Sequence, residues 1–234
     1  MIDIGVAGLL VGFAPTVVVL LIMYRWAAGV GTGLYATARM LAQLLLIGYV
    51  LIFIFETDRP PVILLVVVVM LLAAAGIAIR PIDDRTLPAY LRALAAIVVS
   101  SVLTIALVTQ FVIGVEPWFS PRYVVPLAGM IIAGAMNAVS LAGERMQVEL
   151  GRGEAYDTAR RIAFKASIIP IVNALFAVGL VSLPGMMTGQ ILSGVSPLVA
   201  AKYQIVVMNM LFGAAGAASA LYLLLCKPRS ELAQ

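Results

Sequence analysis

The chain has 234 residues, of which 63% are hydrophobic and 11% charged, with a net charge of +4 and a mean hydropathy of +1.12. Soluble domains carry about 45–50% apolar and about 25% charged residues, so this composition excludes a water-soluble globule. It also excludes a disordered chain, which needs low hydrophobicity. The absence of histidine and the single cysteine, Cys226, exclude Ser-His-Asp chemistry, imidazole metal ligands and an intramolecular disulfide. An integral membrane protein remains.

Seven stretches without Asp, Glu, Lys or Arg approach or exceed the roughly 20 apolar residues that a helix needs to cross a bilayer. In chain order they are 4–23, 40–55, 61–79, 93–115, 123–142, 167–190 and 203–226. The second stretch is short and can be extended by residues 35–38. Backbone in hydrocarbon must satisfy its own hydrogen bonds, and the alternation typical of a transmembrane β-barrel is absent. The sequence therefore predicts an all-α, polytopic transmembrane helical bundle of about seven spans, forming one membrane domain over 1–234.

The basic residues between these stretches predict the orientation. With the N-terminus outside, only Arg59, Arg122 and Lys202 of the 15 basic residues fall on the outer side. The positive-inside rule therefore favours an N-out, C-in topology in the inner or plasma membrane. The first stretch lacks the basic region of a signal peptide, so we expect a retained span. A re-entrant element at 184–201 is an alternative that would change the number of spans.

The inner connection at 143–166 contains five basic and four acidic residues. Its second half predicts a short amphipathic helix after Gly153, in which Asp157 and Arg161 form an i,i+4 ion pair. One face of this helix carries small or apolar side chains, namely Ala155, Ala159, Ile162 and Ala163. Such a helix either lies on anionic headgroups or docks a cytosolic partner, and composition leaves both interpretations open.

The segment 183–197 is the second unusual feature. Pro184 cannot donate a backbone hydrogen bond and Gly185 adds flexibility, so the sixth helix should kink or break there. Non-helical backbone at membrane depth is tolerated where it is buried in protein or lines a wet cavity. Polar or soft side chains follow the proline, namely Met186, Met187, Thr188, Gln190 and Ser193. The alternative is a helix end at the outer surface followed by a glycine-rich turn.

Several classes of function are disfavoured by what the sequence lacks. There is no GxxxxGK[ST] motif, so the chain is not expected to bind nucleotide phosphates by itself. No ionisable residue lies inside the seven stretches, which argues against proton-coupled transport. The basic residues follow the inner membrane face, so no nucleic-acid partner is expected. Amides inside the stretches, such as Gln43 and Asn137, either hold helices together or contact a substrate.

Three blocks of sequence carry a family resemblance. The block Val181-Ser-Leu-Pro-Gly-Met-Met-Thr-Gly189, with Lys202-Tyr-Gln-Ile205 after it, closely resembles the signature of the FetB-like permeases. Residues 38–51 and 125–141 agree with the same family. These permeases are the membrane subunits of ABC transporters and include bacterial iron exporters and the plant aluminium-tolerance permeases. The likeness covers residues 38 to 210, with departures at Ala133-Gly134 and in Leu150-Gly-Arg-Gly153.

The resemblance implies a separate cytosolic ABC ATPase subunit, which would bind the ATP, and a homodimer of this chain in the lipid bilayer. The chain itself is expected to bind no cofactor and not to be an enzyme. The connection 143–166 becomes a candidate coupling loop, with the ATPase-coupling residues Leu150, Gly151, Gly153, Glu154, Ala155, Asp157, Arg160 and Arg161. The candidate substrate path comprises Gln43, Asn137, Ser182, Met186, Met187, Thr188 and Gln190, while metal ligands cannot be named.

The leading hypothesis is thus a permease subunit that exports a metal ion, iron-like, or a small solute. A stand-alone secondary transporter or channel without an ATPase is the first alternative. A lipid-modifying membrane enzyme is the second, and it is disfavoured because histidine is absent and the acids lie in connections. Without histidine, a transported metal would meet thioether, amide, hydroxyl, carbonyl or loop carboxylate groups. Such a site would be weak and suited to release.

Overall fold

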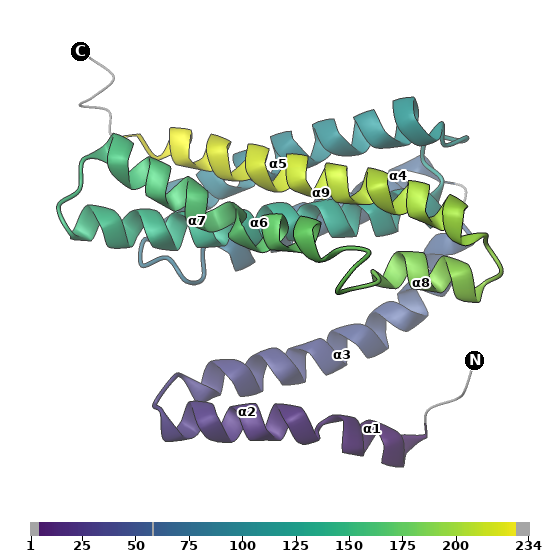
Figure 1. Ribbon diagram of the computed structural model, residues 1–234, viewed down its shortest axis with the longest axis horizontal. Coiled ribbons are helices and arrows are strands. Elements are labelled where there is room, and N and C mark those ends of the chain that lie inside the picture. The colour runs from purple at the N-terminus through teal and green to yellow at the C-terminus, as the bar shows by residue number, and fades with distance from the viewer. Residues whose placement is uncertain (1–4, 58, 228–234) are drawn as a thin grey trace. The chain divides into compact units, whose positions relative to one another are not determined.

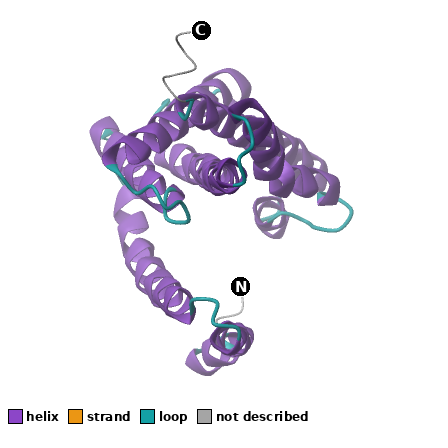
Figure 2. Ribbon diagram, turned by 90° about the vertical axis from the view of Figure 1, so that its left-hand side faces the viewer, coloured by secondary structure: helices purple, strands orange, loops and turns teal. Residues whose placement is uncertain are grey.

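The structure is a computed structural model that describes residues 5–57 and 59–227. The described residues are almost entirely helical and contain no strand beyond one isolated bridge, which confirms the predicted all-α membrane bundle (Figure 2). The chain divides into two compact units, Met1–Glu56 and Thr57–Gln234. The single membrane domain expected from the sequence stays a prediction, and each unit is described by itself.

The first unit contains α1 (Val6–Gly12), α2 (Ala14–Arg25) and α3 (Val30–Phe55) (Figure 1). Pro15, at the start of α2, cannot continue the hydrogen-bond ladder of α1, so the predicted stretch 4–23 is two helices in line; its residue 4 lies outside the described residues. Helix α3 begins ten residues before the predicted stretch 40–55 and includes Arg39, which the sequence placed in a connection.

The described residues of the second unit, 59–227, form seven helical elements. They are α4 (Pro60–Ala78), α5 (Leu87–Ala106), the π-helix η1 (Leu107–Ile113), α6 (Pro121–Gly151), α7 (Tyr156–Ala177), α8 (Gly185–Leu192) and α9 (Pro197–Leu225). Helices α6 and α9 are longer than the apolar stretches that predicted them, because backbone hydrogen bonding continues past the bilayer into charged residues. With 31 residues, α6 is about 46 Å long, whereas the bilayer core is about 30 Å thick.

Helix α6 packs against α4, α5, α7 and α9 and so forms the centre of the second unit. The core between these helices is rich in alanine, and Ala75, Ala93, Ala135 and Ala218 are completely buried. Small side chains let helix backbones approach closely, which is how helices associate where the surrounding lipid is as apolar as the core.

Helix α7 runs antiparallel to α9. The hydroxyl of Tyr156 donates to the carbonyl of Leu223, and the hydroxyls of Ser167 and Ser219 lie 2.5 Å apart. From Ser219, α9 continues about 33 Å back to Pro197, whereas α7 continues only about 15 Å beyond Ser167 to Ala177. The remaining depth is filled by the turn 178–184 and by α8, which packs against α9 (Figure 1).

The sixth predicted span, 167–190, is therefore a broken crossing. Helix α7 ends at Ala177 and α8 starts at Gly185, directly after Pro184, so the predicted break is confirmed. A bridge between Val178 and Ser182 forms the turn in between. The described residues contain six helices long and apolar enough to cross a membrane; α7 is not one of them because its first turns are charged. The expectation of about seven spans is close to this number, and it differs by the broken pair of helices α7 and α8.

Candidate functional site

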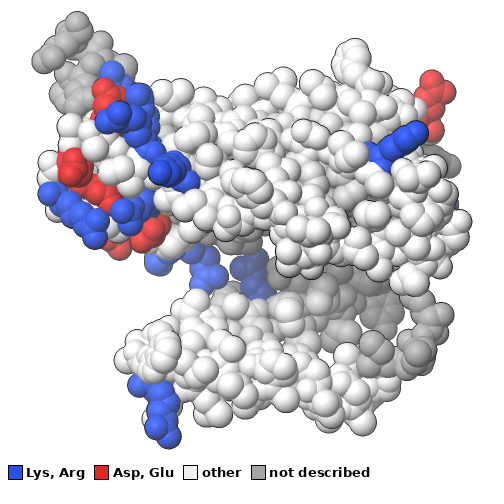
Figure 3. All heavy atoms as spheres, viewed as in Figure 1, with Lys and Arg blue, Asp and Glu red and all other residues white. Residues whose placement is uncertain are grey.

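Charged side chains gather at one end of the second unit (Figure 3). This end, called the charged end below, consists of the connection 79–86 between α4 and α5, the connection 152–155 between α6 and α7, and the end of α9. The long middle of the unit is almost free of charge in the same view. A band of apolar surface with charges at its end is the pattern expected of a bundle that crosses a bilayer.

The α6–α7 turn is tight. Only residues 152–155 separate the two helices, so the predicted inner connection 143–166 is mostly helix. Gly153 adopts a positive φ of 86°, and the amide of Glu154 donates to the carbonyl of Glu149 at 3.2 Å. A glycine in this left-handed conformation ends a helix without steric cost and satisfies its last carbonyls. The predicted short helix after Gly153 is in fact the beginning of the 22-residue α7.

A buried carboxylate stabilises this turn. Glu149 is only 4% exposed, and its Oε1 lies 2.6 Å from Arg145 Nη2 and 3.1 Å from Arg152 Nη1. Both guanidinium groups remain partly exposed, so one carboxylate links the last turn of α6 to the start of the connection. Buried charges persist when they are paired and hydrogen-bonded, and here the pairing fixes the position of the turn.

A second anchor attaches the start of α7 to α9. Tyr156 is 3% exposed, and its hydroxyl donates to the carbonyl of Leu223 at 2.5 Å. Ala159 and Ala163, one and two turns further along, are completely buried in the core. The small-residue face was expected to lie on headgroups or to dock a partner, but its residues Ala159 and Ala163 pack inside the unit, where small side chains let α7 approach its neighbours closely; Ala155 is exposed and Ile162 half-buried.

Seven of the eight predicted coupling residues are exposed at the α6–α7 turn. The exposed ones are Leu150, Gly151, Gly153, Glu154, Ala155, Asp157 and Arg161, while Arg160 is half-buried. The ion pair expected between Asp157 and Arg161 is wrong: Asp157 Oδ1 pairs with Arg160 Nη2 at 3.0 Å. The guanidinium of Arg160 also lies over the ring of Tyr156, 5.6 Å from its centre. This cation–π contact holds the Arg160 side chain against the helical bundle. The structure thus brings the coupling candidates together on one exposed, braced turn.

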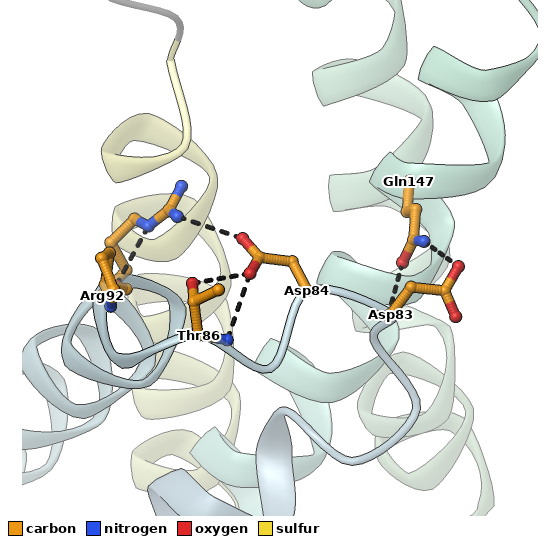
Figure 4. A network of polar contacts seen from close by, with 6 residues as sticks. Asp83, Asp84, Thr86, Arg92 and Gln147 are labelled. Carbon is orange, nitrogen blue, oxygen red and sulfur yellow. Dashed lines mark hydrogen bonds and ion pairs between the residues drawn. The ribbon is translucent and has the colours of Figure 1, made fainter.

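The connection 79–86 contributes a polar network that the sequence did not predict (Figure 4). Gln147 on α6 accepts a hydrogen bond from the amide of Asp83 at 3.0 Å and donates to the carboxylate of Asp83. Asp84 accepts two hydrogen bonds from Thr86, from the hydroxyl at 2.6 Å and from the amide at 3.1 Å. These bonds, with a contribution from nearby Arg92, hold the pKa of Asp84 below its usual value.

These contacts attach the connection 79–86 to α6 beside the α6–α7 turn. The sequence did not indicate Gln147 as a site residue. Only its position inside the charged connection 143–166 could have drawn attention to it. The partner, Asp83, lies 64 residues away, and no spacing rule links the two. The charged end is therefore a surface built from two connections, of which the sequence indicated only one as a site.

The predicted path residues of the sixth span lie along the turn 178–184 and α8. Ser182 is exposed in the turn, and Met186, Met187, Thr188 and Gln190 are half-buried on α8. The hydroxyl of Thr188 donates to the carbonyl of Pro184 at 3.1 Å, so it is satisfied within the helix. By contrast, Gln190 Oε1 is buried without a hydrogen-bond partner. Of this group, Gln190 is the residue whose side chain has an unused acceptor.

The other two path candidates lie elsewhere. Asn137 on α6 is exposed and lines an apolar cavity of about 310 Å³ between α6, α7 and α9, with Gly134 and Ser167. Met186 instead lines a small cavity of about 40 Å³ with Arg122 and Tyr203, at the opposite end from the charged end. Gln43 is exposed on α3 in the first unit. Within the second unit the structure therefore groups the α8 residues and places Asn137 at a different cavity, while Gln43 belongs to the other unit.

Comparison with known proteins identifies the family. The model of the uncharacterised protein family UPF0014 matches residues 6–230, nearly the whole chain. The chain belongs to this family. The resemblance seen in the sequence blocks is thereby confirmed. No solved structure matches the chain.

Three relatives show the range of names within the family. The UPF0014 membrane protein slr1647 of Synechocystis is 37% identical over 196 residues, which cover 77% of this chain and 76% of the relative. The protein ALUMINUM SENSITIVE 3 of Arabidopsis thaliana is 32% identical, covering 85% of this chain and 77% of the relative. The "Probable iron export permease protein FetB" of Escherichia coli is 34% identical, covering 78% and 74%.

Proposed function

We propose that this chain is the membrane-spanning subunit of an ABC transporter that exports a metal ion, iron-like, or a small solute. A separate cytosolic ATPase subunit supplies the energy, and the chain itself carries out no chemical reaction. The membrane bundle and the relative named as an iron export permease support the transport part of the proposal. The name of the second relative, with its reference to aluminium, agrees with a metal-ion cargo.

The observation that carries the proposal is the construction of the α6–α7 turn. Its outer surface is exposed and charged, whereas its base is held by the Glu149 ion pairs and by the bond from Tyr156 to α9. A turn that is exposed yet braced against two helices can transmit a displacement at its tip to those helices, because packed helices move as rigid elements.

Two copies of the chain complete the transporter. Asn137 and Asn173 are exposed on neighbouring helices of the bundle, within or beside the apolar band. An amide facing lipid cannot form the hydrogen bonds it would form in water, so such residues usually meet another helix or a wet cavity. A second copy placed against α6 and α7 would supply the neighbouring helices. It would also enclose a wet substrate path between the two copies.

The test is copurification of this chain with an ABC ATPase subunit from the same organism, followed by measurement of subunit stoichiometry and of metal transport into inside-out vesicles with and without ATP. We expect two copies of each subunit and ATP-dependent uptake. The double variant E154R/R161E, changed only on the exposed turn, should lose ATPase association. The matched control K202E, also exposed but at the other end of α9, should retain it.

Two results would contradict the proposal. Transport by this chain in liposomes without ATP would favour the stand-alone transporter or channel. Equal ATPase association by E154R/R161E and the unchanged chain would remove the α6–α7 turn as the coupling surface. For the second result, circular dichroism must first show that E154R/R161E keeps the helical content of the unchanged chain.

A further inference from the structure

A cavity of about 250 Å³, called the charged-end cavity below, opens at the charged end of the second unit. It lies between the connection 79–86, the start of α5, the last turns of α6 and the end of α9. Its lining includes Leu150, one of the candidate coupling residues of the α6–α7 turn. The cavity therefore adjoins the turn on which the proposed function places the ATPase.

The lining of this cavity combines apolar surface with a polar rim. Ile82, Ala89 and Leu150 contribute apolar side chains. The charged side chains of the lining, Asp84 and Arg92, are partly exposed and neutralise each other, since Arg92 Nη2 lies 3.5 Å from Asp84 Oδ2. The cavity thus offers an apolar interior without net charge, which fits an uncharged, apolar group surrounded by hydrogen-bonding atoms.

The size of the cavity limits what can occupy it. Pockets for small molecules and cofactors typically measure about 300–1,000 Å³, which is more than this cavity provides. Protein interfaces, in contrast, are anchored by single large side chains that fill pockets on the partner. We propose that the charged-end cavity receives a large apolar side chain of the cytosolic ATPase subunit. This inference rests on the proposed function and on the orientation that the positive-inside rule favours.

The walls of the cavity are fixed before a partner binds. Gln147 is held by its two hydrogen bonds with Asp83. Ile82 is 5% exposed and packs against α6 at Gly143, where a Cβ atom would clash with it. Tyr222 lines the cavity from α9 and is 4% exposed. A pocket that is already ordered binds a partner at a lower entropic cost.

The position of the cavity gives it a role in coupling. An anchor seated there would contact the connection 79–86, α5, α6 and α9 at once, because all four contribute to the lining. Helix α6 forms the centre of the second unit, and packed helices move as rigid elements. A displacement of the ATPase would therefore reach the centre of the bundle through the cavity as well as through the α6–α7 turn.

The chain's single cysteine, Cys226, lines this cavity and provides the test. Burial raises the pKa of its thiol, so alkylation by a maleimide is slow enough to follow over time. We would measure alkylation of the detergent-purified permease by mass spectrometry, with and without an ABC ATPase subunit from the same organism. At an ATPase concentration of about ten times its Kd, the rate should fall about tenfold, because only the free permease reacts.

Filling the cavity from within gives an independent measurement. Ala89 lines the cavity and is 3% exposed, so Ala89→Leu places additional side-chain atoms where the anchor would sit. This change should weaken ATPase association by about tenfold or more, the effect of losing one buried anchor of an interface. The matched control Ala106→Leu adds the same atoms at a cavity of about 390 Å³ near the other end of α5 and should leave association unchanged. Circular dichroism must show equal helical content for both variants.

The alkylation experiment uses the unchanged chain, so it decides even if Ala89→Leu does not fold. Association of the ATPase without protection of Cys226 would overturn the inference and leave the proposed function in place. Protection of Cys226 with full affinity of a folded Ala89→Leu variant would show that the ATPase covers the charged end without entering the cavity, which also overturns the inference. Failure of the ATPase to associate with the unchanged permease would contradict both proposals.

A deletion distinguishes the ATPase from the chain's own C-terminal residues as the occupant of the cavity. Removal of residues 228–234 should leave the alkylation rate of Cys226 in the permease alone unchanged. A faster rate after this deletion would assign the cavity to the C-terminal residues and would overturn the inference.

Discussion

Gly143 lies where α6 approaches the connection 79–86 and α9 most closely. A Cβ atom at this position would clash with Ile82 Cδ1 and lie 3.1 Å from the hydroxyl of Tyr222. Ile82 is 5% exposed and Tyr222 is 4% exposed, so an added Cβ would have to displace a buried side chain. At this residue the sequence needs glycine for close approach rather than for backbone freedom, since no positive φ is involved.

We therefore predict that Gly143→Ala destabilises the fold by about 1–3 kcal/mol, the usual cost of overpacking a core. The measurement is thermal unfolding in detergent, followed by circular dichroism. Gly213→Ala is the matched control, because Gly213 also lies inside a long helix but has no atom within 4 Å of a built Cβ. Gly213→Ala should leave the melting temperature unchanged or raise it slightly, because alanine has a higher helix propensity than glycine. Equal melting temperatures for the two variants would contradict the prediction.

At the scale of the element, the α6–α7 turn depends on Glu149. Glu149→Gln keeps the shape of the side chain but removes the charge that pairs with Arg145 and Arg152. We expect the free energy of local opening of the turn to fall by about 1–2 kcal/mol, the order of a hydrogen bond to a charged group. Hydrogen exchange of the amides at 150–156, read by mass spectrometry, should accelerate while exchange in the core of α6 stays slow.

Glu154→Gln is the control for this change. Glu154 lies in the same turn, but its side chain is exposed and forms none of the ion pairs found in the described part of the chain. Its loss of charge should leave the exchange rates as they are. If Glu149→Gln and Glu154→Gln accelerate exchange equally, general electrostatics would explain the turn better than the buried carboxylate does.

The sequence predicted the elements better than their contacts. Apolar stretches identified every long helix, because only a helix satisfies the backbone inside hydrocarbon. They missed the helix ends: α6 continues to Gly151 through charged residues, since helical bonding does not stop where the bilayer does. Pro184 correctly indicated the broken crossing. Helix α7 nevertheless ends seven residues before the proline, at Ala177. Two residues later, Gly179 takes a positive φ of 81°.

The contacts of the charged end could not have been predicted in the same way. The bond from Tyr156 to Leu223 joins residues 67 positions apart, and the bond from Asp83 to Gln147 joins residues 64 apart. Neither pair follows from helical periodicity, which relates only neighbours three or four residues apart. The small residues Ala159 and Ala163 illustrate the same limit. Their periodicity correctly indicated a helical face, but only the fold shows that this face is buried.

For the whole molecule, the broken crossing decides the topology of the second unit. Helices α6 and α9 both end at the charged end, so the chain between Gly151 and Pro197 must return through the bilayer. Helix α7 alone is too charged at its start to be counted among the six apolar helices. Together α7, the turn 178–184 and α8 cover the depth of α9. The α6–α7 turn and the α8–α9 connection are therefore expected on opposite sides of the membrane.

Cysteine accessibility tests this topology. In the cysteine-free C226S background, we would introduce E154C at the α6–α7 turn and S193C after α8, both exposed positions. The positive-inside rule puts the charged end in the cytosol. A membrane-impermeant maleimide should therefore label S193C in intact spheroplasts, and E154C only after the membrane is opened. Labelling of both positions from outside would show that α7 and α8 do not cross the membrane. Labelling of E154C alone from outside would show that the chain has the opposite orientation. Either result would also place the α6–α7 turn out of reach of a cytosolic ATPase, which ties the topology to the proposed coupling surface.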